Sequence, residues 1–388
     1  MMKGLLGIGA LLLCLMIAPS LLSTASTPSQ QQIDAIFSAV TKPDAPGLAI
    51  LWRKDGRTVF ERGYGVRDLR RRAKIDAETN FRLASCTKQF TAMAVMLLVH
   101  DRKLTYETRL TDVFPDFPAY GKSITIRNLL NHTSGLPDYE DLMLAVETPR
   151  NSWVWTETRQ IQDLEVLKLL EHESVGKFQP GTKWAYSNSG YVVLGLVVAK
   201  VSSEPFGGFL RDRIFAPLKM HNTLAFVKGT NEVANRAFGH SMLGGEWRET
   251  DQSPTSATLG DGGVYSSLAD LAKWDDALAH HTLLGEAEMQ PALTPVNVPR
   301  ATAAAADAEA NANVPANALA QYGFGWFLDP YRNHARMWHD GGTQGFRTTI
   351  QRFTQDRLTI IVLCNRVDLG PSDLAKRVAD LFFASTAH

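Results

Sequence analysis

A serine and a lysine spaced for covalent catalysis occur in the first quarter of the chain. Ser85 stands three residues before Lys88, which opens the apolar run Lys88–Val99, and this run contains no glycine or proline and predicts a buried helix. Residues three apart on a helix share a face, so the amine lies beside the hydroxyl. A serine hydroxyl needs a neighbouring base to become nucleophilic, and burial and a helix N-terminus lower the pKa of a lysine towards that task. The pair is therefore a candidate nucleophile and base.

The spacing alone is a weak signal. Ser174 and Lys177 repeat it, but the turn Gln179-Pro180-Gly181 follows that copy and no helix begins there. The structural alternative for Ser85 is an ordinary helix N-cap.

Two further polar groups support a catalytic cleft. Tyr186 and Asn188 directly precede the apolar helical run Gly190–Leu196, so a phenol and an amide emerge where a loop enters a helix. The sequence His339-Asp340-Gly341-Gly342 ends a predicted strand and faces Gly345-Phe346-Arg347 of the next strand. Glycines at such a place let a backbone N–H approach a substrate oxygen without side-chain interference.

Other aromatic and imidazole groups are assigned to structure. His132 has no G-x-S-x-G elbow to serve, so we expect it to brace its loop rather than to act in catalysis. Trp153, Trp155 and Trp184 are candidates for lining the cleft, but packing is the more common use of such side chains.

Composition narrows the classes of function. The chain has 388 residues, with 40 Lys+Arg against 40 Asp+Glu, so it carries no general basic field for nucleic acid. None of its 10 histidines lies in H-E-x-x-H, and no phosphate-binding loop or dinucleotide fingerprint occurs in a strand-to-helix setting. We expect no metal and no cofactor.

Cys86 and Cys364 are expected to be packed thiols. A single disulfide bridge between them is permitted, but Cys364 ends a buried strand.

The N-terminal segment predicts export. Lys3 precedes an apolar stretch at 4–18, and Ser23-Thr24-Ala25 forms a small-x-Ala cleavage signature, so residues 1–25 are a predicted signal peptide. The mature protein is then periplasmic or extracellular. The alternative is an uncleaved segment that tethers the protein to a membrane, which Pro19 disfavours.

Periodicity further along the chain predicts an α/β fold with an antiparallel sheet flanked by helices and built from both chain ends. Strands are predicted at 47–52, 58–64, 323–328, 334–339, 345–353 and 358–364, and helices at 30–40, 88–99, 126–130, 164–170, 191–201, 267–279 and 372–383. The predicted α/β domain is discontinuous, 26–80 and 240–388, and carries a mostly helical domain at 81–239, with an Ala/Asn-rich surface insertion at 301–320. The cleft between the two domains is the default site.

The ordered groups S-x-x-K, Y-x-N and H-x-G resemble the serine beta-lactamase and penicillin-binding protein superfamily, in particular its branch of class C beta-lactamases, D-stereospecific peptidases and related esterases. Similar phrases occur outside these motifs, namely ITIRNLLNHTSGLP at 124–137, FQPGTKWAYSNSG at 178–190 and GDGGVYSSLADLAKW at 260–274. The resemblance covers roughly residues 33–383 and implies a beta-lactamase/transpeptidase-like fold.

The resemblance also implies roles for the motif residues. Ser85 is the expected acyl-accepting nucleophile, and Lys88 and Tyr186 form a coupled proton-transfer pair whose base the sequence does not identify. Asn188 is expected to position the lysine and the substrate amide. The N–H groups of Ser85 and Gly342 form the implied oxyanion hole, and Gly341 and Arg347 are the expected substrate-binding residues.

The third motif departs from the lactamase pattern, because His339 and Asp340 replace the lysine and threonine of Lys-Thr-Gly. An ordinary histidine is mostly neutral at about pH 7 and holds a carboxylate poorly. Asp340 faces away from His339 and Gly341 if the strand alternates. We therefore expect an esterase or D-amino-acid peptidase that takes a small-molecule or peptide substrate, including one derived from the cell wall. A true beta-lactamase or D-alanyl-D-alanine carboxypeptidase, and a penicillin-binding sensor with little turnover, remain the alternatives.

Overall fold

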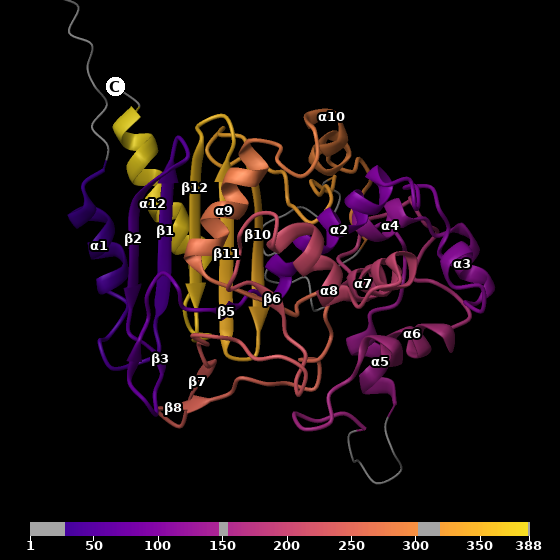
Figure 1. Ribbon diagram of the computed structural model, residues 1–388, viewed down its shortest axis with the longest axis horizontal. Helices are drawn as coiled ribbons and strands as arrows, with labels where there is room; N and C mark the ends of the chain where they lie inside the picture. The colour runs from indigo at the N-terminus through magenta and orange to yellow at the C-terminus, as the bar shows by residue number, and fades with distance from the viewer. Residues whose placement is uncertain (1–27, 147–153, 302–318, 387–388) are drawn as a thin grey trace, which may run out of the picture.

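A five-stranded antiparallel sheet in the order β10-β11-β12-β1-β2 forms the centre of the computed structural model (Figure 1). The structure describes residues 28–146, 154–301 and 319–386. The sheet strands are β1 (Leu48–Lys54), β2 (Arg57–Tyr64), β10 (Arg336–Thr343), β11 (Phe346–Phe353) and β12 (Leu358–Cys364). In β1–β12 pairing Leu48 lies opposite Cys364 and Lys54 opposite Leu358, so the two ends of the chain meet in the middle of the sheet. The predicted fold class is confirmed.

Both faces of the sheet are covered. Helices α1 (Gln30–Ser38) and α12 (Pro371–Thr386) pack on one face, and α9 (Leu268–Ala279) packs on the other. Alternate residues of β1 enter the two cores, because Leu48, Ile50 and Trp52 belong to the core under α1 and α12 while Ala49 and Leu51 belong to the other. This explains why the strand is an unbroken apolar run.

The middle of the chain is helical and lies beyond the β10 edge of the sheet (Figure 1). Its helices are α2 (Lys88–His100), α3 (Leu110–Val113), α4 (Ile126–Leu130), α5 (Tyr139–Ala145), α6 (Asp163–Glu171), α7 (Asn188–Ser202) and α8 (Phe206–Leu210), with single turns η1 (Ala84–Thr87) and η2 (Ala119–Ser123) and a π-helical turn η3 (Arg211–Phe215). Helices α2 and α7 pack against each other in the largest core. The predicted domain boundaries at residues 80 and 240 remain a prediction.

Smaller elements connect these parts. They are β3 (Val66–Asp68) with β4 (Ala73–Lys74), the sheet β5 (Phe81–Arg82), β9 (Val264–Ser266) and β6 (Leu224–Ala225), the pair β7 (His240–Leu243) and β8 (Glu246–Glu249), and α10 (Glu286–Met289) with η4 (Gln290–Leu293). Within the described ranges, no single helix is long and apolar enough to span a membrane, and one pair bent by 79°, Asn188–Ser202 with Phe206–Phe215, meets those criteria jointly.

Two strand predictions are wrong. Residues 323–328 form no strand, because Gly325 has φ +76° and the N–H of Gly323 donates to the carbonyl of Trp326, which makes a turn. The predicted strand 334–339 is displaced to Arg336–Thr343, so His339 lies inside β10 rather than at its end. The predicted signal peptide at 1–25 and residues 302–318 of the predicted insertion lie outside the described residues.

Candidate active site

The turn that precedes α2 presents one accessible residue. From Phe81 to Leu98 every residue is buried except Ser85, which is half-buried. The preceding residue, Ala84, has φ +47°, a left-handed conformation that costs an L-residue about 1 kcal/mol or more. The chain therefore bends sharply between β5 and α2, and this bend leaves the Ser85 side chain at the surface of a cavity.

Lys88 contacts Ser85 as the spacing predicts. Its Nζ lies 3.0 Å from Ser85 Oγ, 2.8 Å from Asn188 Oδ1 and 3.0 Å from the carbonyl oxygen of Asp261. Burial lowers the pKa of Lys88 to about 8, and the more distant charges of Asp261 and Glu140 oppose that shift. A measurable fraction of the lysine is neutral near pH 7, about a tenth by this pKa.

Tyr186 and Asn188 enter the site from the start of α7. The Ser187 hydroxyl caps this helix by accepting the N–H of Gly190 at 3.1 Å, which fixes the two flanking side chains. The Tyr186 ring centre lies 4.8 Å from Lys88 Nζ. Burial raises the pKa of Tyr186 well above its ordinary value, although a hydrogen bond with Ser85 opposes the shift, so the phenol keeps its proton.

His132 supports this helix start, as predicted for a bracing residue. Its Nδ1 accepts the N–H of Ser187 at 3.1 Å, and its carbonyl accepts the N–H of Ala185 at 3.0 Å. The imidazole is 1% exposed, and its ring centre lies 4.5 Å from that of Tyr186. Burial holds its pKa well below the usual range, so His132 is neutral and cannot act as an imidazolium.

His339 is neutral and bonded within the protein. It is 2% exposed, its Nε2 lies 3.1 Å from the Tyr322 hydroxyl and its Nδ1 lies 2.6 Å from the carbonyl oxygen of Asp340. The carbonyl can only accept, so Nδ1 donates and Nε2 accepts from Tyr322. Burial lowers the pKa of His339 to about 3, and the nearby Lys88 charge adds to this effect. The third motif therefore supplies no cation.

The free edge of β10 carries the backbone amide of Gly342, which is the predicted second donor of an oxyanion hole. The N–H and carbonyl of Trp338 bond to Phe327 on the side away from β11. Alternation along an antiparallel strand then places the backbone groups of Gly342 on the same free edge. Asp340 has its side chain on the opposite face from His339, as predicted, and burial raises its pKa to about 6 while hydroxyls of Thr349 and Ser372 oppose the shift.

Gly341 serves close packing, and the substrate contact expected of it remains a prediction. A Cβ at this position would lie 2.2 Å from the carbonyl oxygen of Leu83 and 2.3 Å from Thr348 Oγ1. At Gly342, by contrast, the first atom met is Arg347 Nη1 at 3.7 Å. The missing side chain at 341 lets β10 lie directly against the turn that carries Ser85.

These residues surround a cavity of about 590 Å³. The predicted residues that line it are Ser85, Tyr186, Asn188, His339, Gly341, Gly342 and Arg347. Lys88 lies behind Ser85 and is fully buried. The Arg347 guanidinium is anchored by the carbonyl oxygens of Thr343 and Phe346 at 2.9 and 2.8 Å. The cavity thus brings together every residue that the three motifs singled out.

Several site residues were not predicted. Glu140 lines the cavity, and partial desolvation raises its pKa to about 7, with the charges of Asp138 and Asp261 adding to the shift. Phe327 and Trp338 join Tyr186 in the aromatic lining, whereas Trp155 and Trp184 are buried and absent from it. Trp153 lies outside the described residues.

Comparisons with known proteins agree with the fold described above. The Beta-lactamase family model matches residues 33–384. Penicillin-binding protein 4* of Bacillus subtilis is 28% identical over 350 residues, which are 87% of this chain and 72% of that protein. Among solved structures, a penicillin-binding protein from Bacillus halodurans superposes with TM-score 0.72 at 26% identity, covering 90% of this chain and 98% of the other. D-amino acid amidase from Ochrobactrum anthropi SV3 superposes with TM-score 0.73 at 24% identity, covering 92% and 99%.

Proposed function

The chain belongs to the beta-lactamase family, and from this premise we propose that it is a serine hydrolase that cleaves esters or amides through an acyl-enzyme at Ser85. The observation that carries the proposal is the set of contacts around Lys88. Two of its three hydrogen bonds go to carbonyl oxygens, Asn188 Oδ1 and the Asp261 carbonyl, which can only accept. In the neutral amine the lone pair is then left for the Ser85 hydroxyl, 3.0 Å away.

The proposed reaction has two halves. Lys88 takes the Ser85 proton while Oγ attacks the acyl carbon, and the N–H groups of Ser85 and Gly342 stabilise the resulting oxyanion. The bond to the leaving alcohol or amine breaks as that group takes the proton back from Lys88, with the protonated phenol of Tyr186 in the relay. Water then attacks the acyl-enzyme by the same steps, which releases the acid and restores the Ser85 hydroxyl.

The neutral His339 supports neutral esters and amides as substrates over penicillins. Both of its ring nitrogens are engaged within the protein, and burial holds its pKa at about 3, so it offers no charge to a ligand carboxylate. Glu140 on the wall of the same cavity, once ionised, favours a substrate with an amine near the scissile bond. These two features support esterase or D-amino-acid peptidase chemistry.

Arg347 favours a second candidate. Its guanidinium lies in the cavity beside Gly342 and is a cation that a terminal carboxylate could reach. A D-alanyl-D-alanine carboxypeptidase, which recognises such a carboxylate, is therefore the competing function.

The test compares wild type with Ser85→Ala on p-nitrophenyl butyrate, D-alanine p-nitroanilide and a fluorescent penicillin, with intact-protein mass measured in parallel. We expect turnover of the ester or the anilide by wild type only, with little penicillin adduct. Equal activity in Ser85→Ala would reject the nucleophile. Rapid penicillin hydrolysis would favour a beta-lactamase, and a lasting adduct without turnover would favour a penicillin-binding sensor.

Glu140→Gln tests the preference for an amine. We expect KM for the D-alanine anilide to rise about tenfold above neutral pH, where the carboxylate exists, while KM for the uncharged butyrate ester stays constant. Arg347→Gln is the matched control on the other wall of the cavity, and it should leave the anilide KM unchanged. A parallel rise for both substrates in Glu140→Gln would contradict the assignment.

A further inference from the structure

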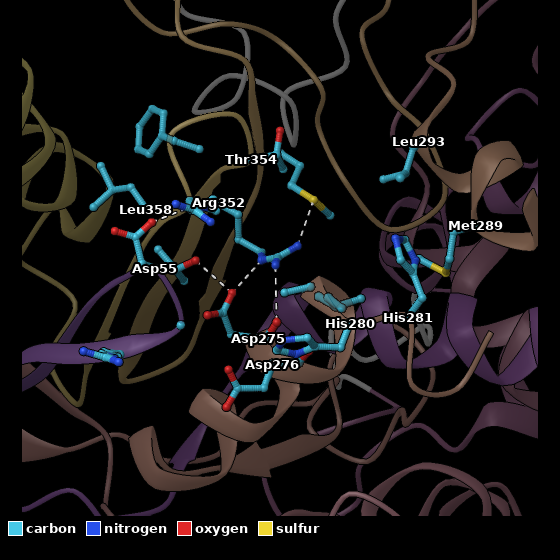
Figure 2. Close-up of a pocket in the computed structure, with 18 residues that line it drawn as sticks. Asp55, Asp275, Asp276, His280, His281, Met289, Leu293, Arg352, Thr354 and Leu358 are labelled. Atoms are coloured by element: carbon cyan, nitrogen blue, oxygen red, sulfur yellow. Dashed lines mark hydrogen bonds and ion pairs between the residues drawn. The ribbon is translucent and has the colours of Figure 1, made fainter. Parts of the chain in front are cut away.

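A second cavity, of about 720 Å³, lies between the sheet and the end of α9 (Figure 2). Its walls come from the β1–β2 turn, the β11–β12 turn, the C-terminal end of α9 and the segment from α10 to η4. It shares no lining residue with the cavity at Ser85. Its volume falls in the usual range for small-molecule sites.

A buried arginine lies at the inner end of this cavity. Arg352 is 9% exposed, and its Nε donates to Asp275 Oδ1 at 2.7 Å. Its Nη2 donates to the Asp275 carbonyl at 3.3 Å, and its Nη1 contacts the weak acceptor Met337 Sδ at 3.3 Å (Figure 2). A guanidinium has five N–H donors, so two of those of Arg352 have no acceptor among the described residues.

The acidic groups around Arg352 are already paired. Asp275 is shared with Arg53 at 2.6 Å and accepts the Thr359 hydroxyl at 2.8 Å, and Asp276 pairs with Arg53. Asp55, on the β1–β2 turn, pairs with both Lys54 and Arg357.

The acids of the lining are shared among several cations. The lining holds three acids, Asp55, Asp275 and Asp276, and three cations, Arg57, Arg352 and Arg357, and the acids also pair with Arg53 and Lys54 outside the lining. A buried guanidinium that shares its carboxylate with a second arginine gains from another anion, because two free N–H donors can bind an oxyanion side by side.

The wall opposite the arginine is apolar. Leu278, Met289 and Leu293 supply it, and Met289 is 5% exposed. His281 lies beside Met289 (Figure 2), and its buried Nδ1 has no hydrogen-bond partner within the described part of the chain. A ligand that spans the cavity therefore meets cationic donors at one end and side chains of methionine and leucine at the other.

We propose that this cavity binds a small organic anion, a carboxylate or a phosphate monoester that carries an apolar group, through the free N–H groups of Arg352. The apolar group packs on Met289 and Leu293. Met337 and Arg352 are paired residues of β10 and β11, the two strands that also carry Gly342 and Arg347, so the bound anion lies on the same hairpin as the Ser85 cavity. The proposal does not depend on the chemistry at Ser85.

The test measures binding of phenylacetate and of phenyl phosphate by calorimetry at low salt, with protein labelled at its methionine methyl groups for NMR. We expect the methyl signals of Met289 and Met337 to shift on titration. Arg352→Gln and Leu293→Trp should each weaken binding at least tenfold. Leu293→Trp fills the cavity without touching the ion pairs, so it keeps the test decisive if Arg352→Gln does not fold.

Controls separate this cavity from the one at Ser85. Arg347→Gln should leave the affinity of both probes unchanged, and benzyl alcohol, which has the ring without the charge, should bind far more weakly. Binding of only one of the two probes supports the proposal and identifies the carboxylate or the phosphate as the natural head group. Absence of binding by both probes, or equal weakening by Arg347→Gln, would overturn it.

Discussion

The catalytic potential of Lys88 arises from where its hydrogen bonds go. Its amine is fully buried, yet it contacts two carbonyl oxygens and one hydroxyl rather than a carboxylate. Without a close anion, desolvation decides the result and brings the pKa down to about 8. Burial instead raises the pKa of Tyr186, because a buried phenol resists losing its proton. In the proposed reaction the two residues therefore divide the proton-transfer work, with Lys88 as the base.

This division predicts the pH dependence of kcat/KM. The active form of Lys88 is neutral, so the rate should rise with pH up to about 8 and then level off. Lys88→Ala should lower kcat/KM by about a hundredfold to ten thousandfold, the usual contribution of a general base, and should remove the rising limb. Measuring both profiles on the ester decides the point, since a rising limb that persists in Lys88→Ala would assign the base elsewhere.

Tyr322 is the residue outside the three motifs that holds His339. Tyr322→Phe leaves the buried Nε2 of His339 without its donor, and an unsatisfied buried acceptor costs about 1–3 kcal/mol. We expect the free energy of unfolding in urea to fall by that amount. Tyr331→Phe is the control, because its hydroxyl bonds to Asp380 at a less buried position, at 3.0 Å. If the free energy of unfolding fell equally in the two variants, the contact of Tyr322 with His339 would contribute no particular stability.

At the scale of elements, the active site depends on how closely β10 approaches the turn before α2. The Cys86 thiol donates to the carbonyl of His339 at 3.1 Å, and the Thr348 hydroxyl donates to the carbonyl of Leu83 at 2.8 Å. These contacts join the hairpin β10–β11 to the turn that carries Ser85. Gly341 makes the approach possible, since any Cβ there would overlap the Leu83 carbonyl.

Two adjacent glycines give a matched test of this packing. Gly341→Ala should destabilise the protein by about 2 kcal/mol or more and reduce activity sharply, because backbone on both sides must move apart. Gly342→Ala adds the same methyl group where the first neighbour is the side chain of Arg347 at 3.7 Å, and it keeps the N–H of the oxyanion hole. We expect near-normal melting temperature and activity for Gly342→Ala. Similar damage in both variants would contradict the packing role of Gly341.

At the scale of the whole molecule, the sheet joins segments that are far apart in the chain. β1 lies between β2 and β12, so the complete sheet requires the C-terminal strands to pair with the N-terminal hairpin. The helical middle of the chain packs beside the β10 edge of this sheet, and Ser85, Tyr186 and Gly342 meet at that boundary. The site is therefore a property of the folded chain as a whole.

We propose that the protein is exported and acts as a mature chain that starts near Ser26. The capping box of helix α1 is formed by Ser29 and Gln32, and both residues belong to the predicted mature chain. The expected result is a mature N-terminus at Ser26 when the full chain is expressed in a secreting bacterial host and sequenced, and an unchanged melting temperature for a chain begun at that residue. A protein that keeps Met1 and sediments with membranes would instead support the tether.

The amino-acid sequence by itself determined the fold class and the residues of the three motifs. Ser85 and Lys88 are three apart at a helix start, and this local geometry already places amine beside hydroxyl. Tyr186 and Asn188 flank a helix cap, which is again a local signal. The strands β1, β2, β11 and β12 were predicted because alternating or continuous apolar runs bounded by turn residues depend on neighbours in the chain.

The tertiary structure alone decided the protonation state of those residues and the identity of the groups that hydrogen-bond to them. The carbonyl of Asp261, the hydroxyl of Tyr322 and the carboxyl of Glu140 reach the site from segments with no motif, and no spacing in the chain encodes their approach. The close approach of Gly341 to the Leu83 carbonyl was not predicted, because only the packing of β10 against the turn before α2 creates it. The short-range pattern of the sequence specifies which groups are available. Desolvation and long-range contacts set the pKa and the orientation of those groups. Both effects arise only when segments distant in the chain pack together and exclude water.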